Sequence, residues 1–110
     1  MALIDVCPLD ALPPGTMKLV SAGPWLTLGV YNVDGDLLAL EDRCSHDDGP
    51  LVEGEWEPDD GLGRPVVICP RHGSRFDLRT GTPLTLPATQ PVDTFPVHVE
   101  DGYVKVEVPG

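Results

Sequence analysis

The sequence predicts an all-β fold, and two observations carry this prediction. Apolar and polar residues alternate with the period of two that is typical of strands, and no segment shows the 3.6-residue period of an amphipathic helix. The 13 prolines and 12 glycines among 110 residues are roughly twice the ordinary share of about 12%. Because proline breaks helices and glycine weakens them, this composition disfavours a helical bundle.

The first expected hairpin lies in the N-terminal half of the chain. A short strand at residues 17–20 precedes a Gly-Pro break, and residues 25–33 read as a longer strand. Asp34-Gly35 predicts a turn, because Gly tolerates positive φ, and residues 37–40 read as the return strand. The apolar face of the longer strand consists of Leu26, Leu28 and Val30.

The clearest expected hairpin lies at the C-terminal end. Residues 95–100 and 103–108 read as its two strands, joined by an Asp101-Gly102 turn. Its apolar positions alternate with polar ones and are Val97, Val99, Val104, Val106 and Val108. Two strands of this kind need further sheet partners to form a stable domain.

The length predicts one domain over residues 1–110, because compact domains most often hold about 100–150 residues. The composition changes in the middle, at residues 43–83, where turn residues are frequent and two of the three cysteines and two of the three histidines occur. Long loops in a compact domain are usually functional. We therefore expect residues 43–83 to form a loop-rich subdomain that carries the function.

Charge and cysteine content restrict the partners and the compartment. The net charge of -11 excludes nucleic acid as a partner and disfavours anionic membrane surfaces, because both attract clusters of Lys and Arg. No stretch is long and apolar enough to span a membrane, and no secretory signal is visible. We expect a cytoplasmic protein with reduced thiols, and the odd number of cysteines argues against a disulfide framework.

Two short motifs carry the chemistry, Cys44-Ser45-His46 and Cys69-Pro70-Arg71-His72. Each offers one thiolate and one imidazole from a short loop. Such a set can hold a tetrahedral Zn²⁺, or a [2Fe–2S] cluster with two Cys on one iron and two His on the other. Zinc fingers more often pair Cys with Cys and His with His, so the mixed pair in each loop favours two metals. Ordinary hydrogen-bonded loop histidines are the remaining interpretation.

With these residues in view, the chain resembles Rieske-type ferredoxins. The resemblance rests on the first motif with Leu51 and Gly54 after it, and on the second motif continued as Gly73-Ser74-Arg75-Phe76-Asp77. It implies a Rieske-like fold of antiparallel sheets with a small cluster-binding subdomain and one [2Fe–2S] cluster. Cys44 and Cys69 would bind the inner iron, and His46 and His72 would bind the outer iron through Nδ1.

The residues around the motifs define a subtype. Respiratory Rieske proteins resemble this chain but have an extra Cys in each loop, at positions that correspond here to Gly49 and Arg71. They also have a Tyr where this chain has Phe76. The resemblance implies that the Ser74 hydroxyl reaches a cluster sulfur, and Pro70 should stiffen the second loop. With one hydrogen-bond donor fewer, the potential should lie toward the low end of the Rieske range of about -150 to +300 mV.

The resemblance implies an electron carrier rather than an enzyme. It would take electrons from an NAD(P)H-dependent flavoprotein reductase and pass them to a terminal non-haem iron oxygenase. Within the family, the alternative is the small subunit of an assimilatory nitrite reductase. Outside it, the alternatives are a structural zinc module for protein contacts and an iron–sulfur redox sensor.

Three further features are given structural rather than functional interpretations. Cys7 has no partner motif and is expected to be a small buried residue. His98 lies at an outward position of the last hairpin and is expected at the surface. Residues 57–65 make the segment between the motifs longer than is usual in the family and should form a surface excursion.

The charge is unevenly distributed along the two motif segments. Residues 69–80 carry two excess positive charges and residues 47–60 carry seven excess negative charges, which predicts a polarised surface.

Overall fold

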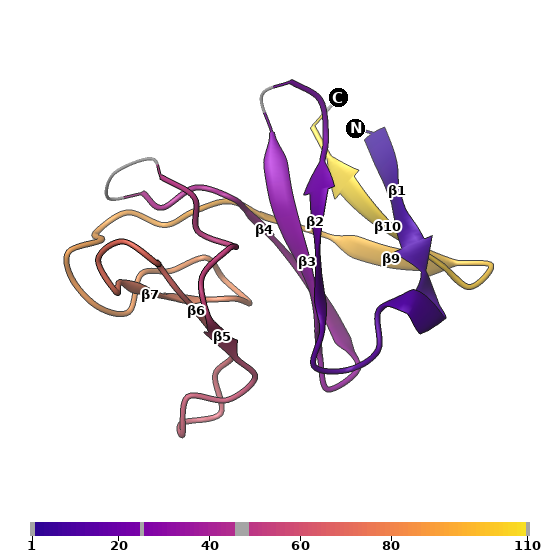
Figure 1. Ribbon diagram of the computed structural model, residues 1–110. Coiled ribbons are helices and arrows are strands. Elements are labelled where there is room, and N and C mark those ends of the chain that lie inside the picture. The colour runs from indigo at the N-terminus through magenta and orange to yellow at the C-terminus, as the bar shows by residue number, and fades with distance from the viewer. Residues whose placement is uncertain (1, 25, 46–48, 110) are drawn as a thin grey trace.

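The computed structural model describes residues 2–24, 26–45 and 49–109, and in this part of the chain the fold is all-β (Figure 1). The only helix there is a single 3-10 turn, Leu9–Ala11. The strands are β1 (Ala2–Pro8), β2 (Met17–Ser21), β3 (Thr27–Val33), β4 (Asp36–Glu41), β5 (Trp56–Glu57), β6 (Val66–Ile68), β7 (Arg75–Asp77), β8 (Thr94–Phe95), β9 (Val97–Glu100) and β10 (Tyr103–Val108). None of the described residues belongs to a helix long and apolar enough to cross a membrane.

The strands form three antiparallel sheets. The first sheet has the order β1-β10-β9, the second β2-β3-β4-β8, and the third β5-β6-β7. In Figure 1 the second sheet stands between the other two, with the first sheet on one side and the third on the other. The molecule therefore has a layered arrangement, with the segment that contains both Cys/His motifs on one side of the second sheet.

Both predicted hairpins are confirmed. β3 and β4 pair across the Asp34-Gly35 turn, and β9 and β10 pair across Asp101-Gly102. Asp34 and Asp101 both have φ of 52°, and the glycines after them have φ of 100° and 76°. Two successive residues with positive φ are what two-residue hairpin turns require, and Asp and Gly tolerate this conformation best.

The boundaries of two predicted strands differ from those observed. Phe95 does not belong to the last hairpin, because it lies in β8 and pairs with Ala39 of β4. Pro96 follows it and separates the two strands, since proline cannot donate a ladder hydrogen bond. The strand expected at residues 25–33 begins at Thr27, and residue 25 lies outside the described part. β1 and the short third sheet were not predicted from the sequence.

β3 is buried on both faces and links two apolar cores. Leu28 and Val30 lie in the core between the first and second sheets, whereas Tyr31 and Val33 lie in the core on the opposite face. The second core also contains Cys44 and Cys69, so the loops of the two motifs pack directly on the second sheet. Alternate residues of β3 thus contribute to different cores, one on each face of the second sheet.

Candidate metal centre

The two motif loops have the same backbone closure. In the first loop the Cys44 N–H donates to the Gly49 carbonyl oxygen at 2.8 Å, and in the second the Cys69 N–H donates to the Ser74 carbonyl oxygen at 2.8 Å. Each bond spans five residues, so each loop returns sharply after its cysteine. In the second loop the Gly73 N–H also donates to the Cys69 carbonyl oxygen at 3.0 Å. The sequence predicted two equivalent loops, and their backbone geometry matches.

The thiols of both motifs are buried in one place. Cys44 is 0% exposed and Cys69 is 1% exposed, and both belong to the same apolar cluster. None of the three cysteines forms a disulfide. Cys7 is also buried, as expected, but it lies in the other core, between the first and second sheets. The two motif cysteines therefore share one core, and the third cysteine lies in the other.

The motif histidine that the structure describes is placed differently from the cysteines. His72 is exposed at the tip of the second loop. His46 lies outside the described residues. Within residues 2–24, 26–45 and 49–109, no three His, Cys, Asp or Glu side chains form a group that could hold a metal ion. Two buried thiols and one exposed imidazole, in loops of matched closure, fit the donor set of a [2Fe–2S] centre that has two Cys and two His.

The residues predicted to surround the centre are mostly buried. Phe76 is fully buried beside Cys69 in the same core, and Pro70 is exposed next to His72. Ser74 is fully buried, and its Oγ accepts a hydrogen bond from the Ala88 N–H at 3.2 Å. Because that bond uses a lone pair, the Ser74 hydroxyl proton remains available for donation.

The sequence did not predict that the segment after residue 83 takes part in the site. The Ser45 hydroxyl of the first loop donates to the Gln90 carbonyl oxygen, while Ser74 of the second loop binds the Ala88 N–H. Ala88 is buried in the core that contains both motif cysteines. Residues 84–92 thus run across both loops. Only long-range contacts reveal this, and no local pattern would have identified it.

The first and second motif loops also touch through Gly54. A Cβ at this position would lie 1.9 Å from the Ile68 carbonyl oxygen and 3.0 Å from Pro70 Cδ. No side chain fits at that distance. The absence of a side chain at Gly54 lets the chain after the first motif lie directly on the strand that leads into the second.

A further residue missed by the sequence argument is Asp42, two positions before Cys44. Its Oδ1 accepts hydrogen bonds from the Leu51 N–H at 2.7 Å and the Val52 N–H at 2.9 Å. Tyr31 is fully buried in the same core, and its hydroxyl has no hydrogen-bond partner in the described part of the chain. Burial and, secondarily, the charge of Asp42 raise the pKa of Tyr31 above its usual range.

Tyr31 also contacts Trp56 of the third sheet. The two ring centroids are 5.1 Å apart with an interplanar angle of 76°, which is an edge-to-face arrangement. Such aromatic pairs add about 0.5–1.5 kcal/mol beyond the burial of their area. Trp56 therefore packs the third sheet onto the second sheet.

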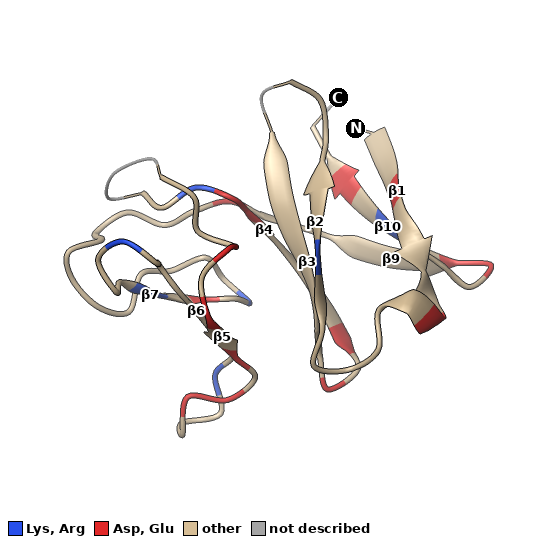
Figure 2. Ribbon diagram, viewed as in Figure 1, with Lys and Arg blue, Asp and Glu red and all other residues tan. Residues whose placement is uncertain are grey.

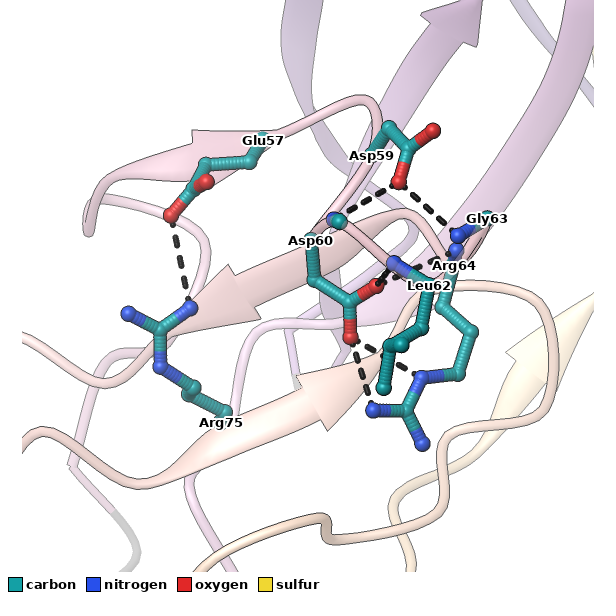
Figure 3. Close-up of polar contacts among 8 residues, drawn as sticks. Glu57, Asp59, Asp60, Leu62, Gly63, Arg64 and Arg75 are labelled. Atoms are coloured by element: carbon teal, nitrogen blue, oxygen red, sulfur yellow. Dashed lines mark hydrogen bonds and ion pairs between the residues drawn. The ribbon is translucent and has the colours of Figure 1, made fainter.

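The excursion at residues 57–65 is a surface loop that is held by its own side chains (Figure 3). Asp59 Oδ1 accepts from the N–H groups of Gly61 and Gly63 at 2.8 and 2.9 Å. Asp60 accepts from the Leu62 N–H at 2.9 Å and forms an ion pair with Arg64 at 2.8 Å. These bonds, first that of the Leu62 N–H, hold the pKa of Asp60 below its usual range. The predicted surface position is confirmed.

Charge is distributed less unevenly in space than along the sequence (Figure 2). Arg75 Nη1 lies 3.3 Å from Glu57 Oε1, and Arg79 Nη2 lies 2.9 Å from Asp36 Oδ2. The positive charges that the second motif segment has in excess are therefore partly offset by acidic residues from other elements. His98 is exposed, as expected, with its Nε2 3.8 Å from Glu107 Oε1.

Comparisons with known proteins agree with this site. Residues 2–96 match the Rieske [2Fe-2S] domain family. The 3-phenylpropionate/cinnamic acid dioxygenase ferredoxin subunit of Escherichia coli K12 is 39% identical over 109 residues, covering 99% of this chain and 96% of that protein.

Solved structures agree as well. One chain in a complex of reduced oxygenase and oxidized ferredoxin of carbazole 1,9a-dioxygenase superposes with a TM-score of 0.83 and 36% identity, covering 94% of this chain and 91% of that one. A putative NADH-dependent nitrite reductase small subunit from Mycobacterium tuberculosis has a TM-score of 0.81, 23% identity and coverages of 99% and 97%, a likeness that shows the fold alone.

The family match decides between the metals that the motifs left open, in favour of the iron–sulfur cluster rather than zinc. Matched loops, buried motif cysteines and similarity along nearly the whole chain lead to one assignment. The chain belongs to the Rieske [2Fe–2S] family and is a Rieske-type ferredoxin, an electron-transfer protein whose cofactor is the [2Fe–2S] cluster of that family.

Proposed function

We propose that this ferredoxin delivers single electrons to the terminal non-haem iron oxygenase of an aromatic-ring dioxygenase system. The observation that carries the proposal is the 39% identity to a dioxygenase ferredoxin subunit along 99% of the chain. The carbazole 1,9a-dioxygenase complex, which combines a ferredoxin with its oxygenase, supports the same direction of electron flow. The electron donor in this proposal is an NAD(P)H-dependent flavoprotein reductase.

We propose that the cluster ligands are Cys44, His46, Cys69 and His72. Support for the cysteines comes from their burial in one core and from the equal closure of their loops. Support for His72 comes from its exposed position three residues after Cys69. His46 is assigned through its place in the first motif. The cysteines would hold the inner iron and the histidines the outer iron.

These positions are consistent with an exchange of single electrons with a docked partner. The bound cluster supplies one reversible electron at a time. The buried cysteine side excludes water, and the exposed His72 side provides the shortest route to a docked partner. The backbone closures and Pro70 hold the loops rigid, so little structural rearrangement accompanies electron transfer.

We propose that Ser74 and Phe76 set the potential. The Ser74 hydroxyl has a proton left after it accepts from Ala88, and a sulfur of the cluster is the acceptor we assign to it. Phe76 excludes water from the buried side but has no hydroxyl to donate. Hydrogen bonds to sulfur favour the reduced, more negative state. One such donor from a side chain fits a potential toward the low end of the Rieske range.

We also propose that residues 1–110 form one domain with a cluster-binding subdomain at about 43–83. The shared core of the second sheet and the motif loops supports a single domain. Cysteines without disulfides support a cytoplasmic location. Limited proteolysis of the holoprotein and cell fractionation test these two statements.

The decisive experiment is electron delivery to a terminal oxygenase. Anaerobic protein containing about two iron atoms per chain is reduced and mixed with the purified oxygenase of the Escherichia coli 3-phenylpropionate/cinnamic acid dioxygenase, and reoxidation is followed by absorption. We expect the oxygenase to accelerate reoxidation. The Cys69→Ala protein is the control without cluster. Reoxidation at the same rate with and without oxygenase contradicts the proposal, as does stoichiometric zinc in place of iron.

A further inference from the structure

Asp42 connects the second sheet with both ends of the first motif loop. It follows β4 directly, and its own N–H donates to the Thr27 carbonyl oxygen at 2.8 Å. Its Oδ1 accepts from the N–H groups of Leu51 and Val52, the two buried residues at which the loop re-enters the core. Asp42 therefore holds the entry to the loop through its backbone N–H and the return of the loop, at Leu51 and Val52, through its side chain.

The charge of Asp42 is not balanced by an ion pair. No Lys or Arg in residues 2–24, 26–45 and 49–109 forms a salt bridge with it. The preceding residue is different, because Glu41 Oε1 lies 3.2 Å from Arg43 Nη2. Two adjacent carboxylates thus lie at the entry to the loop, and in the described part of the chain only Glu41 of the two forms an ion pair.

The Asp42 carboxylate lies at the edge of the core that contains the motif cysteines, because its partners Leu51 and Val52 belong to that core. Tyr31 belongs to the same buried cluster as Cys44 and Cys69, and the charge of Asp42 contributes to the raised pKa of its hydroxyl. A charge that disfavours a phenolate in this core also disfavours any other negative charge that is added there, because the apolar surroundings screen it poorly.

We propose that Asp42 is a positioning residue of the redox site that acts in two ways: its hydrogen bonds to Leu51 and Val52 hold the first cluster loop in place, and its unbalanced charge lowers the reduction potential. This inference rests on the proposed function and its ligand assignment. Two ferric ions, two sulfides and two thiolates sum to zero charge with neutral imidazoles, so reduction by one electron leaves one negative charge. Asp42 repels that charge.

Three variants separate the two actions. Asp42→Asn keeps an oxygen with two lone pairs for both N–H donors but removes the charge. Asp42→Ala removes both the acceptor oxygen and the charge. Asp34→Asn is the matched control, because Asp34 is exposed in the β3–β4 turn at a φ of 52° that Asn also tolerates. It lies one strand length from Asp42, about 20 Å at roughly 3.3 Å per residue.

The measurements are iron content, hydrogen exchange of the Leu51 and Val52 amides, and the redox equilibrium with a reference dye. We expect Asp42→Asn to keep its iron and its protected amides and to shift the equilibrium about tenfold toward the reduced protein, about 59 mV for one electron. Asp34→Asn should shift it less than twofold, because salt screens charges beyond about 8–10 Å. Asp42→Ala should lose iron and exchange both amides faster.

Several outcomes overturn the inference. Full iron content and the wild-type potential in Asp42→Asn would show that the charge of Asp42 has no effect on the potential. An Asp42→Ala protein with full iron and protected amides does not need the hydrogen bonds. If Asp42→Asn loses its cluster as completely as Asp42→Ala, an amide oxygen does not substitute for the carboxylate and the stated geometry is wrong. Failure of the proposed function is distinct, because it appears in the wild-type protein as the absence of iron or of transfer to the oxygenase.

Discussion

The base of the molecule and its loop region are held together by different interactions. The base consists of the first and second sheets, with strands of up to seven residues around an apolar core. The loop region, residues 42–92, has strands of only two or three residues. There, side chains such as those of Asp42, Ser45 and Ser74 bind backbone groups far along the chain.

This difference teaches which changes each region tolerates. Apolar burial is not directional, so the base should lose stability in proportion to the volume removed and keep its geometry. A hydrogen bond depends on individual atoms, so the loop region should lose function through single polar groups and single close contacts. The five predictions below test this comparison, from the largest expected effect to the smallest.

The largest effect is expected from the motif cysteines. Cys44→Ala and Cys69→Ala should each abolish the cluster, whereas Cys7→Ala, in the core of the base, should keep it. Iron and acid-labile sulfide analysis, about two of each per wild-type chain, makes the measurement. Loss of the cluster in the Cys7 variant would show that the two regions do not separate as stated.

Gly54→Ala is expected to be nearly as severe. The added Cβ would lie 1.9 Å from the Ile68 carbonyl oxygen, so the two motif loops would have to move apart. Overpacking of this kind typically costs about 1–3 kcal/mol or more. We expect iron content to fall well below that of Glu53→Ala, a change at the exposed neighbouring residue. Equal iron content in the two variants would contradict the close contact.

Leu28→Ala should damage the base without altering the site. Leu28 is fully buried between the first and second sheets, and such truncations cost about 2–5 kcal/mol. Chemical denaturation measures this loss of unfolding free energy. The reduction potential of the folded holoprotein should stay within about a few millivolts of the wild-type value. The substitution lowers the free energy of unfolding but lies in the core of the base, away from the cluster loops. A shifted potential would mean that the base transmits its strain to the loops.

Ser74→Ala and Phe76→Tyr should do the opposite of Leu28→Ala: they should change the reduction potential and leave the stability of the base unchanged. Ser74→Ala should lower the potential, and Phe76→Tyr should raise it by tens of millivolts if the new hydroxyl reaches a thiolate or sulfide. About 30 mV for one electron corresponds to about 0.7 kcal/mol, the size of one modest hydrogen bond. Protein-film voltammetry measures both. An unchanged potential in Ser74→Ala would remove Ser74 from the site.

Tyr31→Phe should produce the smallest effect at neutral pH, because its pH-dependent effect is confined to alkaline pH. The pKa of Tyr31 is raised in the folded protein, so above about pH 10 the unfolded chain loses a proton that the folded chain keeps. Stability of the wild type through this group therefore falls as pH rises, by up to about 1.4 kcal/mol per unit. The free energy of unfolding, measured at pH 8 and at pH 11, should fall less between the two pH values in Tyr31→Phe than in the wild type. An equal loss would show that the hydroxyl titrates normally.

The sequence by itself determined the all-β class, both hairpin turns and the four proposed ligands. These follow from local rules, because period-two alternation, Asp-Gly turns and Cys/His spacing are each readable within a few residues. It also identified Ser74 and Phe76 as residues around the second motif, and the structure buries both of them.

Tertiary structure alone decided what lies around those residues. Three features join positions that are 9 to 56 residues apart. They are the pairing of Phe95 with the second sheet, the contact of residues 84–92 with both motif loops, and the hydrogen bonds of Asp42 with Leu51 and Val52. The physical reason is that a hydrogen bond or a ladder pair depends on closeness in space, and closeness between distant segments arises only when the whole chain has folded.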